Sequence, residues 1–289
     1  MLEKNGTLYF DATCLRDVTN CREFFRRKYI ENIVPKRPAV DREFGISVHK
    51  AVDAFWKGDD YAAAYRLAGE TFAALDLTYA NIKDREKHER LSDALPEVIG
   101  VYYEEHGEAT DQAMLESEWV HNYLPGVHLC GRIDRYSFDF VLFDVKTASE
   151  IGRSWKSDYK EAALREIGIA LYDWYLHKVQ PDSSPRQVVL EVLVKPYGNK
   201  PARYEHLELP EVVTDSYRRR FDQLLDFRVR ELAHWWGSYQ AMKPWPQNDG
   251  SQCVSKYGQC DYLKLCNHGD SPRNLELYTI RQEHLEARR

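Results

Sequence analysis

The stretch VHLCGRIDRYSFDFVLFDVKT, residues 127–147, decides the fold of this chain. Its two halves, residues 127–136 and 138–147, are rich in Val, Ile, Leu, Phe and Tyr, so each predicts a β-strand. Side chains alternate between the two faces of a strand, which places Asp144 and Lys146 on one face near the strand's end. Asp134 ends the neighbouring strand and can converge on this pair. The sequence therefore predicts two carboxylates and an ammonium at one end of a sheet.

These three side chains suit chemistry on a phosphate. Two aspartates offer hard oxygen ligands to a magnesium-type cation, which bridges a substrate phosphate and water. A neighbouring lysine can stabilise the charge that develops on phosphorus, or help to activate the attacking water. A D-x-K triplet on its own is more often an exposed ion pair at a strand end. The surrounding motifs decide between the two interpretations.

Two further motifs precede the triplet. Apolar residues recur at helical spacing between Gly45 and Lys57 and predict a buried amphipathic helix, with His49 beside its apolar stripe. A lone histidine in such a place is more often a packed core residue than a ligand. Here, however, the motifs GISVH (45–49), GRID (131–134) and DVK (144–146) follow one another in a characteristic order. This order resembles the RecB-like branch of the PD-(D/E)xK nuclease superfamily.

The resemblance extends from about Cys14 to Cys266 and implies a fold class. The expected structure is a restriction-endonuclease-like α/β core with a mixed central sheet flanked by helices. Residues 1–289 would form a single nuclease domain. Within it, residues from about 58 to 112 would be a helical insertion, and residues 250–268 a C-terminal cysteine segment.

The resemblance also implies roles for the site residues. His49, Asp134 and Asp144 would hold one or two Mg²⁺ or Mn²⁺ ions, and the backbone carbonyl of Val145 would complete the coordination. Lys146 would position or activate water and stabilise the transition state. The predicted catalytic set is therefore His49, Asp134, Asp144 and Lys146.

Two accessory candidates lie outside these motifs. Residues 114–123 predict a strand, and Glu118 stands roughly where many relatives have a glutamate. It is either an additional carboxylate at the metal or a surface side chain. On the helix predicted from about 159 to 178, relatives usually carry Q-x-x-x-Y, but Gly168 replaces the glutamine here. Tyr172 keeps the aromatic position and is a candidate for stacking or hydrogen bonding near DNA.

The remaining patterns outline the rest of the fold. They predict a helix from about Val18, a break at Pro35 and Pro38, a strand covered on both faces at 187–196, a paired strand at 202–209, and a long helix at 212–236.

Three of the six cysteines, Cys253, Cys260 and Cys266, form a C-x6-C-x5-C pattern near the C-terminus. Disulfides are rare inside cells, so clustered cysteines in an intracellular chain indicate a metal. In the iron–sulfur subset of RecB-like nucleases, which includes AddB and CRISPR-associated relatives, one cysteine precedes the nuclease core and three follow it. By this resemblance Cys21 would be the fourth ligand, and a [4Fe–4S] cluster would staple the two ends of the domain together.

Zinc fits four such ligands equally well, with His268 or Cys14 as alternative fourth ligands. Spacing alone leaves both metals open, and the resemblance favours the iron–sulfur cluster. The sequence departs from the family pattern in two places. Cys21 lacks the proline that often follows it, and the first C-terminal gap is wider than C-x2-C. Cys130, inside a predicted strand, is expected to be a core residue.

Composition limits the partners. The formal charge of −6 gives no overall attraction to nucleic acid, so contacts with DNA must come from local basic faces. No stretch approaches the roughly 20 apolar residues of a membrane span. Residues 1–4 contain no hydrophobic signal core. We therefore expect a soluble, cytoplasmic protein with no membrane partner.

Together the motifs predict a metal-dependent DNA nuclease. The resemblance favours exonuclease action on single-stranded or duplex ends, with protein partners in recombination or other DNA processing, and a phage or CRISPR setting by analogy. One alternative is a nuclease-like DNA-binding or assembly subunit without catalysis, which the missing glutamine favours and the full His/Asp/Asp/Lys set opposes. Another is a zinc-stabilised structural protein with a fortuitous D-x-K.

Overall fold

The computed structural model describes residues 2–4, 6–109, 113–149, 155–238, 253–255 and 258–280. These residues form two compact units, each built from separate parts of the chain. The first unit comprises Met1–Arg37, Trp119–Gly131 and Arg219–Arg289, and the second comprises Pro38–Glu118 and Arg132–Arg218. Parts of two predicted segments, residues 110–112, 250–252, 256 and 257, lie outside the described residues. That the whole chain is one nuclease domain stays a prediction.

A mixed β-sheet organises the second unit. Strand β6 (Val141–Ser149) runs parallel to β7 (Gln187–Lys195), and β7 runs antiparallel to β8 (Arg203–Glu208). On its other side, β6 pairs antiparallel with the end of β5 (Val127–Ser137). The interior of β7 is buried at every position from Val188 to Val194, as expected from its almost continuous apolar run, which only Glu191 interrupts. The predicted mixed central sheet is confirmed.

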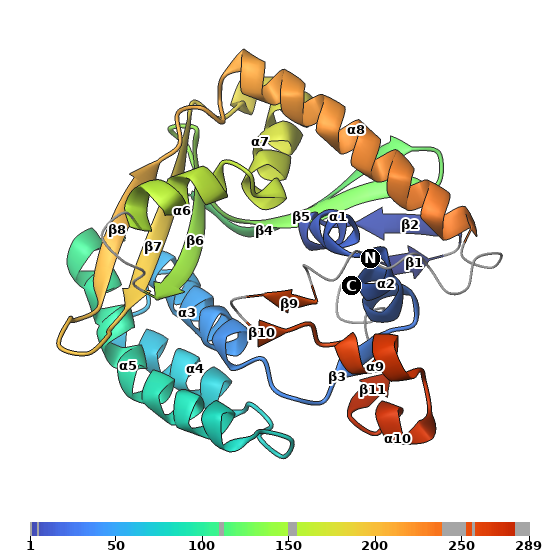
Figure 1. Ribbon diagram of the computed structural model, residues 1–289. Coiled ribbons are helices and arrows are strands. Elements are labelled where there is room, and N and C mark those ends of the chain that lie inside the picture. The colour runs from blue at the N-terminus through green and yellow to red at the C-terminus, as the bar shows by residue number, and fades with distance from the viewer. Residues whose placement is uncertain are drawn as a thin grey trace. The chain divides into compact units, whose positions relative to one another are not determined.

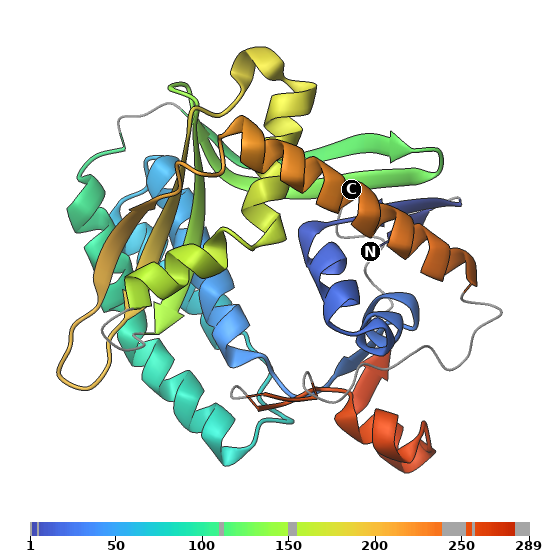
Figure 2. The same ribbon diagram turned by 45° about the horizontal axis from the view of Figure 1, so that its top comes forward.

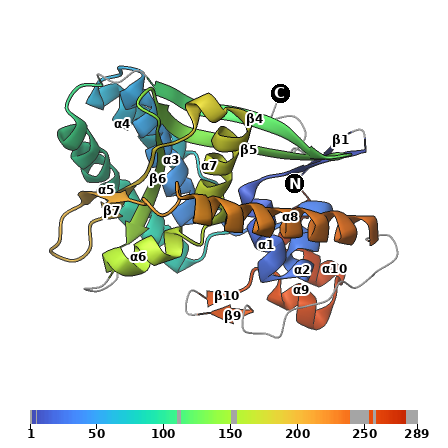
Figure 3. The same ribbon diagram turned by 90° about the horizontal axis from the view of Figure 1, so that it is seen from above.

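Helices cover both faces of this sheet, as Figures 1 and 3 show. On one face lie α3 (Val40–Trp56), α4 (Tyr61–Ala73) and α5 (Ile82–His106), and on the other lies α6 (Trp155–Ala163). Helices α3 to α5 share one hydrophobic core with the sheet, which includes Phe44, Ile99, Val145 and Leu193. The region predicted as a helical insertion therefore contributes directly to the core of this unit.

The helix predicted from about 159 to 178 is in fact two helices, α6 and α7 (Ile167–Val179). Glu166 has an extended backbone at the start of α7, with φ −74° and ψ 127°. The Tyr217 hydroxyl donates a hydrogen bond of 2.8 Å to the carbonyl of Leu164, which lies at this break. Helical periodicity cannot reveal such an interruption, because the group that stabilises it lies 53 residues further along the chain.

The first unit joins the N-terminal and C-terminal parts of the chain. Strands β1 (Leu2–Lys4) and β2 (Thr7–Phe10) form a hairpin, and β2 runs parallel to the start of β5, which β4 (Ala113–Leu124) also pairs. After β2 come α1 (Ala12–Asn20), α2 (Arg22–Phe25), the π-helical turn η1 (Arg26–Ile30) and β3 (Ile33–Pro35). The first helix thus begins at Ala12, earlier than predicted, because Asp11 caps it by accepting a 2.8 Å hydrogen bond from the Cys14 N–H.

The C-terminal elements return to this N-terminal region. They are the end of α8 (Asp215–Ser238), β9 (Val254–Ser255), β10 (Gly258–Gln259), α9 (Leu263–His268), α10 (Pro272–Leu275) and β11 (Tyr278–Ile280). Strand β11 pairs antiparallel with β3, and Figure 2 shows α9 beside these strands. The Tyr262 hydroxyl donates a 2.6 Å hydrogen bond to the Ile33 carbonyl. In the described part of the chain, no helix is long and apolar enough to cross a membrane.

Candidate active site

The end of the β5–β6 ladder places two aspartates opposite each other. The observed antiparallel register pairs Arg135 with Phe143 and Tyr136 with Leu142, and one further step would pair Asp134 with Asp144. Like charges directly opposite each other destabilise a sheet. The regular pairing stops before this position, and the Val145 N–H instead donates a 3.0 Å hydrogen bond to Asp134 Oδ2. The two carboxylates thus lie where the strands part, an arrangement expected of a site rather than of a stable ladder.

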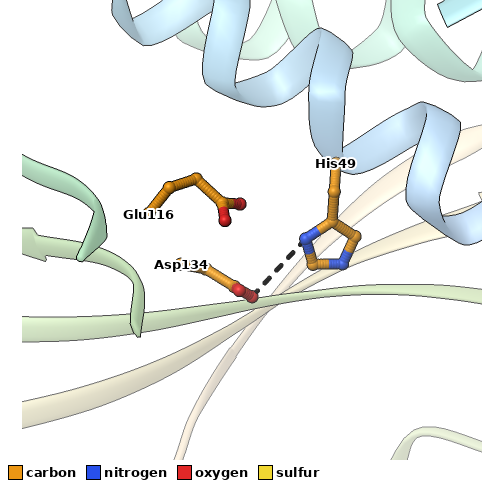
Figure 4. A group of neighbouring side chains, drawn as sticks. All are labelled: His49, Glu116 and Asp134. Atoms are coloured by element: carbon orange, nitrogen blue, oxygen red, sulfur yellow. Dashed lines mark ion pairs between the residues drawn. The ribbon is translucent and has the colours of Figure 1, made fainter. Parts of the chain in front are cut away.

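Helix α3 brings His49 to the same place. Its Nδ1 lies 3.7 Å from Asp134 Oδ2, and Figure 4 shows the imidazole directed from α3 towards that carboxylate. Burial lowers the pKa of His49, although the Asp134 carboxylate and a hydrogen bond to the backbone of Val145 oppose this shift. A neutral imidazole has a lone pair available for a metal ion.

Glu116 completes a group of three possible ligands. One atom each of His49, Glu116 and Asp134 lies within 4.8 Å of the other two (Figure 4). Burial raises the pKa of Glu116 to about 7, with Arg132 opposing the shift and Asp134 adding to it. The Arg132 guanidinium lies 2.5 Å from Glu116 Oε2.

The glutamate brought to this group differs from the candidate read from the sequence. Glu118 lies on the same strand β4 but is exposed, and it is outside the three-ligand group. Glu116 has φ +46°, so its backbone departs from regular extended geometry and the ordinary alternation of β4 is interrupted there. Sequence reasoning missed Glu116, and the available signal was only a second glutamate two residues away.

Asp144 and Lys146 form an ion pair next to this group, in which Asp144 is buried and Lys146 is half-buried. Lys146 Nζ lies 2.9 Å from Asp144 Oδ1 and 2.7 Å from Oδ2, and Asp144 is 3% exposed. Burial raises the pKa of Asp144 to about 7, with Lys146 opposing and Asp134 adding to the shift. Burial alone would lower the pKa of Lys146, but the carboxylates of Asp144 and Asp134 outweigh it and hold the pKa above its usual value. Lys146 is therefore cationic at neutral pH.

A cavity of about 550 Å³ opens over these residues. Its wall contains the three possible ligands, Lys146 and several further charged side chains. The lining residues are Asp41, Arg42, Gly45, Ile46, His49, Lys50, Asp53, Glu116, Arg132, Asp134, Lys146 and Thr147. Carboxylates and cations thus face one space, which can hold a cation together with an anionic ligand.

Close packing in the first unit explains why the GRID motif begins with a glycine. A Cβ atom on Gly131 would lie 3.0 Å from the indole of Trp119, which is 5% exposed. Gly131 therefore permits the close approach of β4 and β5 just before Asp134.

The structure places the other predicted site residues as follows. Val145 is buried between Asp144 and Lys146, and its backbone contacts both His49 and Asp134. Tyr172 is half-buried on α7. Asp144 is not one of the three grouped ligands. It is close enough to Asp134 and Lys146 to interact with both electrostatically.

The four cysteines expected to bind a cluster lie near one another in the first unit. Burial raises the pKa of Cys266 to about 11, Arg27 lowers it, and Cys260 and Cys21 are close enough to raise it further. Burial likewise raises the pKa of Cys260, with added contributions from Cys21 and Cys253. The Cys260 N–H donates a 2.8 Å hydrogen bond to the Cys253 carbonyl. These contacts bring the two ends of the sequence together at the four thiols.

Polar and aromatic groups surround these thiols. The Phe24 N–H donates a hydrogen bond of 3.5 Å to Cys21 Sγ, and the backbone of Tyr262 bonds to the Cys260 sulfur. Cys260 and Cys266 pack against a small core that contains Ile33, Tyr262, Leu265 and Tyr278. Cys14 and Cys130 are buried elsewhere, in α1 and β5, and His268 is exposed.

The chain matches the PD-(D/E)XK nuclease superfamily over residues 10–267. Among solved structures, it is similar to a protein of Eubacterium rectale named as a candidate exonuclease, with a TM-score of 0.49 and 10% sequence identity, over 91% of this chain and 88% of that chain. No curated protein sequence matches. The matched range spans all residues of the candidate site.

Proposed function

The chain belongs to the PD-(D/E)XK nuclease superfamily, and from this premise we propose that it is a Mg²⁺- or Mn²⁺-dependent deoxyribonuclease. The observation that carries the proposal is one cavity in which His49, Glu116 and Asp134 converge beside the Asp144–Lys146 pair. DNA ends are the proposed substrate, by the resemblance to RecB-like nucleases. The proposed reaction is hydrolysis of a phosphodiester bond.

The donor atoms fit a divalent cation. Two carboxylates and an imidazole within 4.8 Å of one another match the ligands that such ions take in proteins. Asp144 Oδ2 is buried and lies 2.7 Å from the Lys146 ammonium in an ion pair without hydrogen-bond geometry, which leaves a lone pair of this oxygen for a metal cation. In this proposal Glu116 joins His49, Asp134, Asp144 and the Val145 carbonyl as a ligand. The bound ion would polarise the phosphate and lower the pKa of a coordinated water.

The protein's own groups supply the rest of the chemistry. Lys146 stays protonated beside Asp144 and Asp134, so its ammonium is suited to stabilise negative charge on the phosphate in the transition state. This favours charge stabilisation over proton abstraction as the role of Lys146. Arg132 lines the same cavity and offers a second cation for a substrate phosphate. Asp134, held by the Val145 N–H, has a fixed orientation for its remaining lone pairs.

We also propose that Cys21, Cys253, Cys260 and Cys266 hold a [4Fe–4S] cluster. Two observations support a cluster site: the four thiols converge, and backbone N–H groups donate hydrogen bonds to the sulfurs of Cys21 and Cys260. Zinc is the alternative metal for the same four thiols. The resemblance to the iron–sulfur subset of RecB-like nucleases favours the cluster. Its proposed role is to hold the two ends of the first unit together.

The function is tested by cleavage of end-labelled linear DNA and of closed circular DNA, each with Mg²⁺, with Mn²⁺ and with EDTA. We expect metal-dependent loss of linear DNA, and none of circular DNA, because an exonuclease needs an end. Cleavage of both forms would refute the exonuclease proposal and indicate an endonuclease, since closed circular DNA has no ends. Absence of cleavage by metal-replete protein that binds DNA would favour the non-catalytic subunit and refute the proposed activity.

A further inference from the structure

A buried carboxylate lies behind the candidate active site. Glu191 on β7 is fully buried, and in the parallel ladder it is in register with Val145 on β6. Because side chains alternate along a strand, Val145 and Glu191 share one face while Asp144 and Lys146 project from the other. The proposed catalytic function does not use Glu191 directly.

Four polar side chains surround this carboxylate. Glu191 Oε1 lies 2.8 Å from Arg135 Nη2 and 3.3 Å from His106 Nε2, and it accepts a 3.2 Å hydrogen bond from the Tyr204 hydroxyl. Glu191 Oε2 accepts a 3.1 Å hydrogen bond from the Tyr102 hydroxyl. Both oxygens are therefore bonded, so the ionised form is stabilised within the protein interior.

The cation paired with Glu191, Arg135, is also held by several contacts. Arg135 is 3% exposed, and its guanidinium carbon lies 3.3 Å from the ring centre of Phe143 and 4.1 Å from that of Trp56. The indole N–H of Trp56 also donates a 2.7 Å hydrogen bond to the Tyr102 hydroxyl. We name Glu191, Arg135, Tyr102, Tyr204, His106, Trp56 and Phe143 the buried network.

Three members of the buried network lie on elements that carry a site residue. Arg135 follows Asp134 on β5, and Phe143 precedes Asp144 on β6. Trp56 lies on α3, two helical turns beyond His49. The network thus connects α3, β5 and β6 on the side away from Asp144 and Lys146.

Stability alone does not explain this arrangement. Well-packed apolar residues in place of a buried ion pair are often as stable or more stable, because burying charges has a large desolvation cost. Directional bonds provide something that apolar contacts lack, namely fixed separations between the elements they join. The separation of β5 and β6 needs such bonds near the site, because the pairing of these two strands stops before the opposed Asp134 and Asp144.

We propose that Glu191 and Arg135 are positioning residues, which set the separation of β5, β6 and α3 and thereby the geometry of His49, Asp134 and Asp144. This inference rests on the proposed function. Misplacing ligands by a fraction of an ångström weakens metal binding and slows the reaction together. The network would act through the strands and the helix, because none of its members lines the site cavity.

The test is the Glu191→Gln variant, which keeps the shape of the side chain and removes its charge. We expect the Mn²⁺ concentration for half-maximal binding, measured by electron paramagnetic resonance without DNA, to rise about tenfold. The kcat for DNA cleavage should fall about tenfold or more at saturating Mn²⁺. If Glu191→Gln does not fold, Tyr204→Phe decides the question, because it removes one hydrogen bond and should shift Mn²⁺ binding about threefold in the same direction.

Asp173→Asn is the matched control. Asp173 on α7 is 1% exposed and forms a bidentate pair with Arg218, at 2.7 and 2.9 Å, in the same unit, and neither residue belongs to the buried network or lines the site cavity. The Asp173→Asn variant should have a lower melting temperature, but unchanged Mn²⁺ binding and an unchanged kcat per folded molecule. If the network variants behave in the same way as this control, the positioning role is refuted and the pair is merely structural. If the wild-type protein neither binds Mn²⁺ nor cleaves DNA, the proposed function fails first, and the inference with it.

Discussion

Lys146 Nζ lies within 2.9 Å of both carboxylate oxygens of Asp144, and the pair is flanked by Asp134 on the neighbouring strand. The half-buried ammonium is thus kept charged by two carboxylates. Removing the ammonium should raise the free energy of the transition state more than it lowers the stability of the fold. We expect Lys146→Ala to lower kcat about 10²–10³-fold, as when one preorganised donor is removed from a developing charge.

The measurement is single-turnover cleavage, with DNA binding followed separately by gel shift in EDTA. Arg203→Ala is a suitable control, because it removes a cation that is paired with Glu205 on β8 and does not line the site cavity. Cleavage by Lys146→Ala at the rate of this control would exclude Lys146 from the mechanism.

The two raised carboxyl pKa values predict a pH dependence. Glu116 and Asp144 each have a pKa of about 7 before metal binds, and a ligand carboxylate must lose its proton. Cleavage should therefore decline as the pH falls below about 7. Raising the Mg²⁺ concentration should move the midpoint to lower pH, because the ion competes with the protons. A midpoint that is independent of Mg²⁺ would contradict this account.

The same values predict the stability of the metal-free protein. The folded state keeps protons on Asp144 and Glu116 that the unfolded chain releases near pH 4. The stability contribution of this protonation is fully present below about pH 4 and is lost as the pH rises through about 7. In EDTA, melting temperatures should thus decline between pH 5 and pH 8 more in the wild type than in Asp144→Asn, which cannot ionise. Parallel curves for the two proteins would count against the raised pKa of Asp144.

The choice between the two glutamates of β4 can be tested directly. Glu116 lies within 4.8 Å of His49 and Asp134, whereas Glu118 is exposed. We expect Glu116→Gln to raise the Mg²⁺ concentration for half-maximal cleavage about 10–100-fold, because a carboxylate at the ion is lost. Glu118→Gln, the matched control two residues away, should leave it unchanged. The reverse result would restore Glu118 as the accessory carboxylate.

Gly131 should resist substitution for a packing reason. A methyl group there would lie 3.0 Å from the Trp119 indole, so Gly131→Ala should destabilise the protein by about 1–3 kcal/mol. Chemical denaturation measures this loss. The double variant Gly131→Ala, Trp119→Leu should show a smaller additional loss from the alanine than the single variant does. Equal losses in both backgrounds would show that the indole is not the cause.

The thiol site predicts a coloured protein. Anaerobically purified wild type should be brown, absorb near about 400 nm and contain iron, whereas a zinc protein would be colourless because of its closed d shell. Cys260→Ser should lose the iron and much of the soluble protein. Cys14→Ala should keep the iron, since Cys14 is buried in α1, apart from the converging thiols. A stable, metal-free and active Cys260→Ser variant would refute the stapling role.

Several features followed from the sequence because they are encoded locally. The apolar runs of β5 and β7 predicted their bounds closely, and the helical spacing after Gly45 predicted most of α3. The start of β6 was less accurate. It begins at Val141 rather than Phe138, because residues 137–140 form a turn in which Phe140 has φ +65°. The confirmed fold class rested on the order of short motifs, which needs no knowledge of long-range contacts.

Other features depended on contacts between distant residues. Whether Glu116 or Glu118 faces the ligands depends on one irregular backbone angle in β4. The break between α6 and α7 involves Tyr217, far along the chain. The bonds around Glu191 join residues 13 to 89 positions away, so no local pattern indicates them.

The sequence by itself determined the superfamily motifs, the strands and helices that carry them, and the residue types available for a metal and for phosphate. Those properties reside in side-chain chemistry and in periodicities of two and 3.6 residues. The tertiary structure decided that Asp134 and Asp144 face each other where pairing stops, that Lys146 is held between carboxylates, and that Glu191 is buried behind them. The physical reason is that strand register and burial set the distances between charges, and those distances determine pKa values and metal binding.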